Sequence, residues 1–370
     1  ILDDVGTFIP LGNSGDRALL PNELPPEIRL QLGADSEPLQ LARTFRIEAR
    51  SDLPRAQVFS PIDGSAELTN GRLPLQVGFG GGGDVDNLAA TAYISDESDD
   101  DRGGGRLTYE ATIRTPGKLL AVMSADNDPL TPRSGEYHFN MPQPIPSYLL
   151  AIAVGNIYFA PIGERTGIYS EPEMLDASTF EFSTTQQMLE TTESIYGPYQ
   201  WGRYDLLILP PSFPYGGMEN PRLSFITPSI LAGDQSLVSL IAHELAHSWS
   251  GNLVSNRTWR DIWLNEGTTS YLDARLIEVL FGKDRADEER VLSYRELIQG
   301  LNEVSPEMQA LAPREKLDDP DESQGSIHYQ KGQLFLQHLE NIFGRETFDL
   351  FLASYFKNFE FLSISSEQFL

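Results

Sequence analysis

The sequence predicts a multidomain protein in which an all-β domain precedes an α+β domain. The chain has 370 residues, more than one hydrophobic core usually holds, so two cores are expected. From Thr44 to about Tyr169, short β-prone runs alternate with clusters of Gly, Pro and Asp. After Glu171, longer runs with helical periodicity dominate. We therefore predict a β-sheet domain over residues 1–168 and a second domain over 169–370.

The first half contains three clear β-prone runs and two unusual segments. Strands are expected at Thr44–Glu48, Leu107–Ile113 and Leu119–Met123. The glycines Gly80–Gly83 and the acidic run Asp96–Asp101 can bury too little apolar area to offset the entropy lost on ordering. Both segments are therefore predicted to be exposed loops.

The second half is predicted to be mainly helical, with a small sheet. Two β-type runs, Tyr204–Leu209 and Leu223–Thr227, supply that sheet. Apolar residues at helical spacing predict helices around Ala177–Tyr196, Ser236–Ser250, Leu264–Leu280, Asp287–Asn302, Tyr329–Phe343 and Glu346–Phe356.

Charge and cysteine content exclude several kinds of partner and site. The chain has 27 Lys and Arg against 54 Asp and Glu, a net charge of −27, which repels nucleic acids and anionic membranes. Neither is an expected partner. With no cysteine, the chain forms no disulfide and no thiolate metal site. Any metal must be held by His, Asp or Glu.

The sequence gives weak indications of location and assembly. Its most apolar stretch, Tyr148–Pro161, is shorter than the roughly 20 residues of a membrane span. The chain opens at Ile1 without a charged and then apolar leader, so a signal peptide is absent or already removed. We expect a monomer and slightly favour the cytoplasm, with a secreted or periplasmic location still open.

The central motif is His243-Glu244-Leu-Ala-His247, within a predicted helix. At 3.6 residues per turn, the two histidines project from one face and can bind one ion at about 2.0–2.1 Å. Glu244 lies one position further round the helix, where it can reach the attacking water as a general base. The same pattern can arise by chance on any amphipathic helix. Two histidines on an apolar face are costly to bury without an ion, however, so we favour a metal site.

A third ligand is expected at Glu266. It follows His247 after 18 intervening residues, in Trp263-Leu-Asn-Glu266-Gly267, and a helix-turn-helix can return it to the two histidines. Two His, one Glu and an open position suit a single catalytic Zn²⁺ per chain, and the spacing is typical of a gluzincin. Asp273 lies about two turns further along the same helix face. It either accepts a hydrogen bond from a ligating His or is an ordinary exposed carboxylate.

Several motifs together resemble the M1 family of metallo-aminopeptidases, nearest its leukotriene A4 hydrolase and aminopeptidase B branch. Besides the two zinc motifs, these are Gly216-Gly-Met-Glu219-Asn220 and Tyr329-Gln-Lys-Gly332. The resemblance runs from about Leu107 to Leu370 and implies a thermolysin-like α+β catalytic domain. That domain would be incomplete at its C-terminal end, and the family's C-terminal helical domain is not among these residues.

The resemblance also implies roles for residues outside the zinc motifs. Glu219 would bind the free α-ammonium of a peptide, beside a backbone that Gly216, Gly217 and Met218 leave open to a peptide strand. Tyr329 would donate its hydroxyl to the oxyanion. Asp321 matches an acidic residue at the base of the pocket and would favour a basic first side chain.

The sequence therefore predicts a zinc-dependent aminopeptidase that removes the N-terminal residue of peptides with a free amine. Three alternatives remain open: an enzyme that also opens a fatty-acid epoxide, a zinc endopeptidase and a noncatalytic peptide-binding relative. Gln324 stands where the branch has a tyrosine near its epoxide chemistry. The family's Gln-containing substrate motif is not found in residues 1–106.

Overall fold

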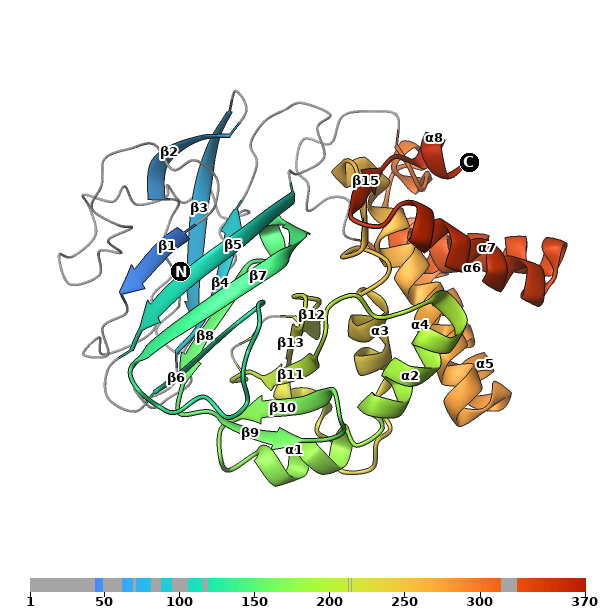
Figure 1. Ribbon diagram of the computed structural model, residues 1–370. Coiled ribbons are helices and arrows are strands. Elements are labelled where there is room, and N and C mark those ends of the chain that lie inside the picture. The colour runs from blue at the N-terminus through green and yellow to red at the C-terminus, as the bar shows by residue number, and fades with distance from the viewer. Residues whose placement is uncertain are drawn as a thin grey trace. The chain divides into compact units, whose positions relative to one another are not determined.

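The computed structural model describes residues 44–48, 62–68, 71–80, 88–94, 106–115, 119–211, 213, 215–313 and 325–370 (Figure 1). By contacts within the chain, these residues fall into two compact units. Unit 1 holds the described residues from 44 to 183 and those within 203–235, and unit 2 holds 184–202 and the described part of 236–370. None of the described helices is long and apolar enough to cross a membrane.

The described residues of unit 1 form three sheets. The first has the strand order β1-β5-β7, the second β2-β3-β4-β8-β6 and the third β12-β13-β11-β10-β9. In the third sheet, β10, β11 and β13 run parallel, while β9 and β12 are antiparallel to their neighbours. The strands of unit 1 are β1 (Thr44–Glu48), β2 (Ile62–Leu68), β3 (Gly71–Gly80), β4 (Leu88–Ile94), β5 (Arg106–Arg114), β6 (Leu120–Met123), β7 (Glu136–Pro146), β8 (Ala151–Gly155), β9 (Tyr158–Pro161), β10 (Thr166–Ser170), β11 (Tyr204–Ile208), β12 (Gly217–Met218) and β13 (Leu223–Ile226).

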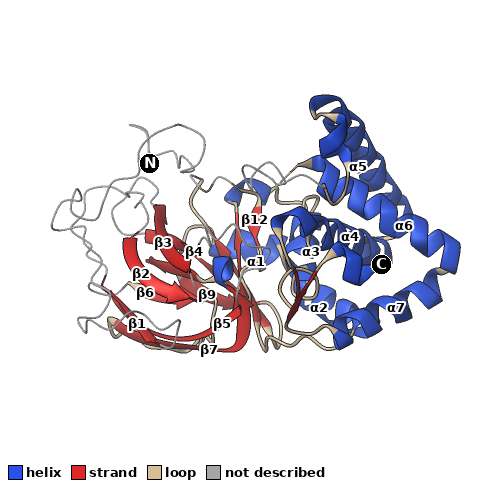
Figure 2. Cartoon of the chain, turned by 90° about the horizontal axis from the view of Figure 1, so that it is seen from above, coloured by secondary structure: helices blue, strands red, loops and turns tan. Residues whose placement is uncertain are grey.

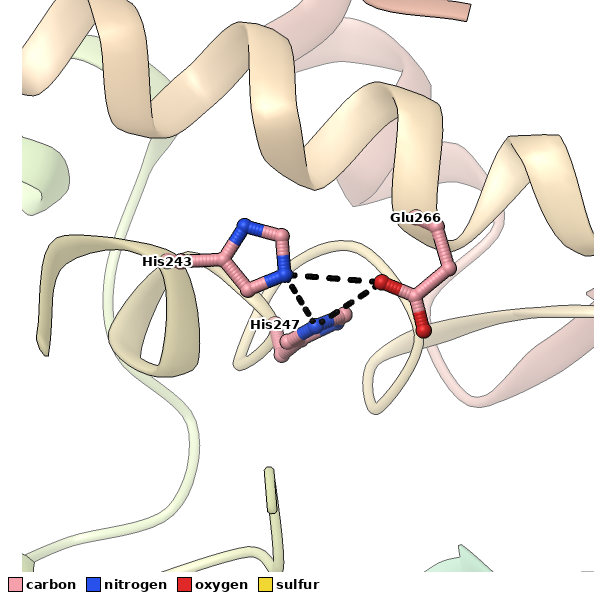
Figure 3. Close-up of side chains that lie close together, drawn as sticks. All are labelled: His243, His247 and Glu266. Atoms are coloured by element: carbon pink, nitrogen blue, oxygen red, sulfur yellow. Dashed lines mark hydrogen bonds and ion pairs between the residues drawn. The ribbon is translucent and has the colours of Figure 1, made fainter. Parts of the chain in front are cut away.

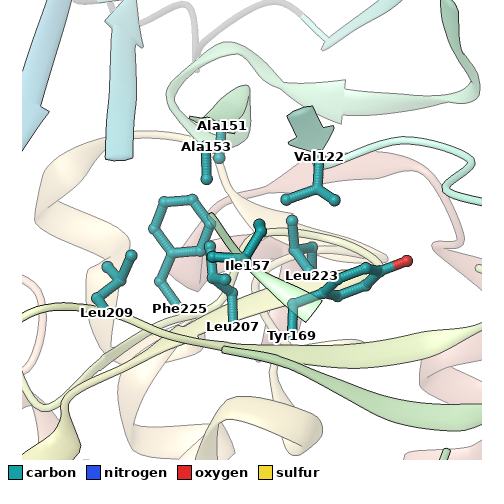
Figure 4. Close-up of a cluster of buried hydrophobic side chains, with 9 residues drawn as sticks. All are labelled: Val122, Ala151, Ala153, Ile157, Tyr169, Leu207, Leu209, Leu223 and Phe225. Carbon is teal, nitrogen blue, oxygen red and sulfur yellow. The ribbon is translucent and has the colours of Figure 1, made fainter. Parts of the chain in front are cut away.

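A buried apolar cluster joins the second and third sheets of unit 1 (Figure 4). Strands β6 and β8 contribute small side chains such as Val122 and Ala153, and β11 and β13 contribute larger ones such as Leu207 and Phe225. The central strands β10, β11 and β13 of the third sheet are buried along their whole length, as is typical of parallel strands covered on both faces. This core fixes the sheet whose edge strand β12 carries the Gly216–Asn220 motif.

Unit 2 is helical, apart from a two-stranded sheet of β14 (Val254–Asn256) and β15 (Leu362–Ile364). Helix α4 packs against α3, α5 and α6, and its residues Tyr271, Leu272 and Ile277 are fully buried. Figure 2 shows these helices in blue. Helix α1 (Leu175–Glu181) belongs to unit 1. The described helices of unit 2 are α2 (Thr185–Tyr196), α3 (Ser239–Ala246), α4 (Glu266–Phe281), α5 (Lys283–Glu303), α6 (Gly332–Phe343), α7 (Arg345–Asn358) and α8 (Ser366–Phe369).

Most predicted elements agree with the structure, and two differ from it. The helix predicted over Ala177–Tyr196 is broken into α1 and α2 at residues 182–184, because Ser183 and Thr184 favour turns over helix interiors. The helix predicted over Ser236–Ser250 is shorter, since α3 begins at Ser239 and ends at Ala246. Part of the predicted Gly80–Gly83 loop and all of Asp96–Asp101 lie outside the described residues.

The predicted domain boundary between residues 168 and 169 stays a prediction. These two residues are neighbours within β10, and all of β10 belongs to unit 1. The combination of sheets and helices is the part of the predicted fold that the structure supports.

Candidate metal centre

Helix α3 brings His243 and His247 onto one face. His247 follows the last residue of α3, but its backbone stays helical and its N–H donates to the carbonyl of His243 at 3.2 Å. Residues 248 and 249 then close a tighter turn, because the N–H groups of Ser248 and Trp249 bond three residues back. The two imidazoles therefore lie one helical turn apart, as the sequence predicts.

Two tryptophans fix the end of this turn. The indole N–H of Trp201 donates to the carbonyl of Ser248 at 2.9 Å, and that of Trp249 donates to the carbonyl of Gly197 at 3.1 Å. Both indoles are fully buried, so each needs such a partner. These bonds tie the segment after His247 to residues 197–201 and limit its movement.

Glu266 is the first residue of helix α4, and a short 3-10 turn leads into it. That turn, Trp259–Leu264, buries Ile262, Trp263 and Leu264. Glu266 then sits at a helix N-terminus, where the helix dipole favours a negative charge. The buried apolar turn thus places the carboxylate of Glu266 beside the two histidines.

The three side chains converge at distances that suit one ion (Figure 3). The two Nε2 atoms are 3.1 Å apart, and each lies 3.4 Å from Oε2 of Glu266. Ligands held at about 2.0–2.1 Å by a tetrahedral ion lie about 3.3 Å from one another. The arrangement therefore fits a tetrahedral zinc site without large rearrangement.

Hydrogen bonds on the far side of each ring fix which nitrogen carries the proton. Nδ1 of His243 donates to Oδ2 of Asp273 at 2.7 Å, and Nδ1 of His247 donates to the carbonyl of Ser250 at 3.1 Å. In the neutral form that binds a metal, each ring keeps its proton at Nδ1 and presents a lone pair at Nε2. We therefore interpret the short distance between the two Nε2 atoms as a meeting of two acceptors rather than a hydrogen bond.

Charge at the centre also favours a cation. Oε2 of Glu266 is buried without a hydrogen-bond donor among the described residues. Burial lowers the pKa of His243, but Asp273 and Glu266 outweigh it and raise that pKa well above its usual value. Without an ion, these carboxylates therefore favour a second proton on the His243 ring, and a divalent ion that displaces this proton from Nε2 supplies the same positive charge.

Glu244 and Tyr329 lie beside these ligands within unit 2. Glu244 follows His243 on α3 and is 5% exposed. Tyr329 lies in a single π-helical turn, Ile327–Lys331, that leads into α6. Its ring is nearly parallel to that of His243, with centroids 6.0 Å apart and an interplanar angle of 18°. Such turns often occur at functional sites.

Sequence reasoning missed Thr269 and His328. The hydroxyl of Thr269 lies 3.1 Å from both Nδ1 of His247 and the carbonyl of Ser250. A signal was present, because Thr269 follows Glu266 by three residues and so shares its helix face. His328 precedes Tyr329, is 2% exposed, and burial lowers its pKa to about 4. No pattern in the sequence marked it.

The predicted amine-binding segment belongs to unit 1. Gly217 and Met218 form β12, which pairs with β13 and is an end strand of its sheet among the described strands. Gly216 is exposed, and Glu219 follows β12 and is 7% exposed. The predicted roles of these four residues stay predictions.

A contact from Arg222 holds the turn after Glu219. Arg222 has a φ of 69°, which non-glycine residues rarely adopt. Its guanidinium donates to Asp126 at 2.8 Å and to Gln143 at 2.9 Å.

Asp321 and Gln324 lie outside the described residues, so the structure does not place them.

The family model of the peptidase family M1 domain matches residues 180–370 of the chain. The match includes His243, Glu244, His247, Glu266 and Tyr329.

Curated relatives agree with this match. Leukotriene A-4 hydrolase of Xenopus laevis is 44% identical over 271 residues, which is 71% of this chain and 44% of the relative. Aminopeptidase B of Mus musculus is 43% identical over 271 residues, which is 72% of this chain and 41% of the relative. The chain thus spans less than half the length of these relatives.

Solved structures resemble the chain over a similar region. Leukotriene A4 hydrolase from Saccharomyces cerevisiae has 38% identity and a TM-score of 0.67, covering 71% of this chain and 42% of its own. An M1 zinc metallopeptidase from Deinococcus radiodurans has 22% identity and a TM-score of 0.61, covering 77% of this chain and 65% of its own. The second likeness concerns the fold alone.

Proposed function

Because the chain belongs to peptidase family M1, we propose that it is a zinc-dependent aminopeptidase that hydrolyses the N-terminal residue from peptides. One observation carries the proposal above all. Two imidazole lone pairs and one carboxylate oxygen converge within 3.1–3.4 Å, and no described group donates a hydrogen bond to that oxygen. Such a cluster is stable only around a cation.

In this proposal, His243, His247 and Glu266 hold one zinc ion per chain. When bound, zinc supplies Lewis-acid chemistry, by polarising the scissile carbonyl and lowering the pKa of water. Asp273 holds His243 through Nδ1, and the carbonyl of Ser250 holds His247 in the same way. These bonds keep each Nε2 unprotonated and directed toward the ion.

Glu244 and Tyr329 carry the proton chemistry. The carboxylate of Glu244 accepts a proton from the attacking water and passes it to the leaving amine. The phenol of Tyr329 donates a hydrogen bond to the carbonyl oxygen as negative charge develops there. Both side chains lie in unit 2 with the zinc ligands.

Glu219 and β12 bind the substrate. The carboxylate of Glu219 pairs with the α-ammonium of the peptide, which selects the first peptide bond for cleavage. An edge strand offers unpaired backbone groups to which an extended peptide can add. Asp321 is proposed to favour a basic first residue.

The test is cleavage of a panel of chromogenic aminoacyl substrates, each with a free amine and with an acetylated copy. We expect the zinc-loaded protein to cleave only the free-amine set, with Arg among the preferred first residues. A chelator abolishes this activity, and Glu244→Gln lowers kcat by about 10²–10⁴-fold through loss of the general base. Glu288→Gln removes an exposed carboxylate of α5 and is the matched control.

The outcomes separate the alternatives. Equal cleavage of acetylated substrates would reject Glu219 as an amine anchor and favour an endopeptidase. Peptide binding without cleavage would favour a noncatalytic relative. Turnover of a fatty-acid epoxide alongside peptide cleavage would extend the proposal to a bifunctional enzyme.

A further inference from the structure

Two glycines of unit 2 touch through their backbones. A Cβ added at Gly267 would lie 2.7 Å from Cα of Gly332 and 2.6 Å from the carbonyl oxygen of His328. A Cβ added at Gly332 would lie 2.7 Å from Cα of Gly267. These neighbours are backbone atoms, which cannot rotate away as a side chain can. Only glycine at both positions allows the two segments to approach so closely.

The contact joins the two parts of the candidate site that come from different segments. Gly267 directly follows Glu266 in the first turn of α4. Gly332 begins α6, three residues after Tyr329 and directly after the π-helical turn. The position of Tyr329 relative to the zinc ligands therefore depends on how closely these two turns approach.

We propose that the contact between Gly267 and Gly332 sets the distance from the Tyr329 hydroxyl to the reacting carbonyl. This inference rests on the proposed function. The two glycines are positioning residues, because they act through Tyr329 and touch no reacting atom. The parallel stacking of Tyr329 on His243, with ring centroids at 6.0 Å, is the arrangement that the contact maintains.

The Tyr329 turn is the side that moves when the contact is widened. The hydroxyl of Thr269 ties the first turn of α4 to the segment after α3, at 3.1 Å from both Nδ1 of His247 and the carbonyl of Ser250. Further along, the guanidinium of Arg275 donates to Asp349 of α7 at 3.0 Å. Helix α4 is thus held at several points, and a Cβ at residue 332 would displace its own segment instead.

The displacement is large enough to affect catalysis. Carbon atoms in contact lie about 3.5–4.0 Å apart, so a Cβ at 2.7 Å requires a shift approaching 1 Å. A misplacement of that size can lower a catalytic rate about 10²-fold. We therefore expect Gly332→Ala to lower kcat by about 10²-fold, with KM and zinc affinity unchanged.

The experiment measures kcat and KM on a free-amine substrate for Gly332→Ala, Gly267→Ala, Tyr329→Phe and the double variant Tyr329→Phe/Gly332→Ala. Zinc content and the unfolding temperature are measured for each. Gly325→Ala is the matched control, because a Cβ at Gly325 meets no described atom within 4 Å although it lies four residues before Tyr329.

The double variant is decisive. If Gly332 acts through Tyr329, replacing it with alanine should not lower kcat further once the Tyr329 hydroxyl is removed. The double variant should therefore have the same kcat as Tyr329→Phe. Additive losses in kcat would overturn the proposal, because the glycine would then act independently of the tyrosine. Loss of the fold in both glycine variants would also overturn it, since the contact would then hold the whole unit rather than one side chain.

Failure of the proposed function gives a different result. In that case the wild-type protein shows no chelator-sensitive aminopeptidase activity, or Tyr329→Phe has wild-type kcat. A large loss in Tyr329→Phe with a wild-type kcat in both glycine variants would reject only the inference about the glycines.

Discussion

Helix α4 carries a buried carboxylate near each end, and arginines form ion pairs with only one of the two. Near its C-terminal end, Glu278 accepts hydrogen bonds from Arg345 at 2.7 and 3.2 Å and from Arg290 at 2.8 Å. At the N-terminal end, Glu266 faces two imidazole lone pairs at 3.4 Å. The side chains of Glu278 and Glu266 are similarly buried, at 12% and 11% exposed.

The difference supports the proposal that Glu278 serves the fold and Glu266 the chemistry. A buried carboxylate is stable when charged donors surround it, and the Glu278 network supplies them from α5 and α7. Glu266 has acceptors where donors would be needed, so the protein leaves room for an external cation there. The comparison predicts that equal changes at the two ends have different consequences.

The largest effect is expected for Glu266→Gln compared with Glu278→Gln. Loss of the charged ligand removes transition-state stabilisation of several kcal/mol, so kcat/KM should fall about 10³-fold or more. Glu278→Gln, on the same helix, should keep wild-type kcat/KM at 15 °C. Steady-state assays with saturating zinc measure both, and equal losses would break the distinction between the two ends.

Asp273→Asn should weaken zinc binding about 10–100-fold, because it loses the carboxylate that accepts from Nδ1 of His243 at 2.7 Å. Competition with a chromogenic chelator measures the affinity. A variant with wild-type zinc affinity would show that Asp273 is an ordinary helix carboxylate.

Arg345→Ala should lower the free energy of unfolding by about 1–3 kcal/mol. It leaves Glu278 and Glu340 with fewer donors, since Arg345 bonds to both. Urea unfolding measures the change, with kcat at 15 °C as the control. Unchanged stability together with lost activity would contradict a structural role for the Glu278 network at the C-terminal end of α4.

The smallest effect concerns pH. Burial would raise the pKa of Glu278, but Arg345 and Arg290 lower it from 4.5 to about 2. A lowered pKa stabilises the fold above the unfolded value of 4.5, and this stabilisation is lost as pH falls toward 2. The stability difference between wild type and Glu278→Gln should therefore be constant from pH 7 to 5 and shrink below pH 4.5. A stability difference between wild type and Glu278→Gln that grows as the pH falls would contradict this prediction.

Local patterns predicted the main geometric features of the candidate metal centre. The spacing of His243 and His247 requires only one regular helical turn, and the predicted place of Glu266 at the start of the next helix depends on a short connection. Helical periodicity also predicted α4, α5 and α7 within a few residues. These features depend on neighbours in sequence, which a single chain reveals.

Features that depend on distant contacts were not predictable. The contact between Gly267 and Gly332 joins segments more than 60 residues apart, and no local pattern indicates it. The roles of Glu219 and Tyr329 came from the family resemblance, because neither residue type nor spacing marks them.

The most direct test of the account is the zinc content of the purified chain, measured by atomic emission after dialysis against metal-free buffer. Wild type and Arg345→Ala should each retain one zinc per chain, and His247→Ala should retain none because it loses one of three protein ligands. If wild type bound no zinc after zinc loading, or His247→Ala retained as much as wild type, the cluster of His243, His247 and Glu266 would not be the metal site.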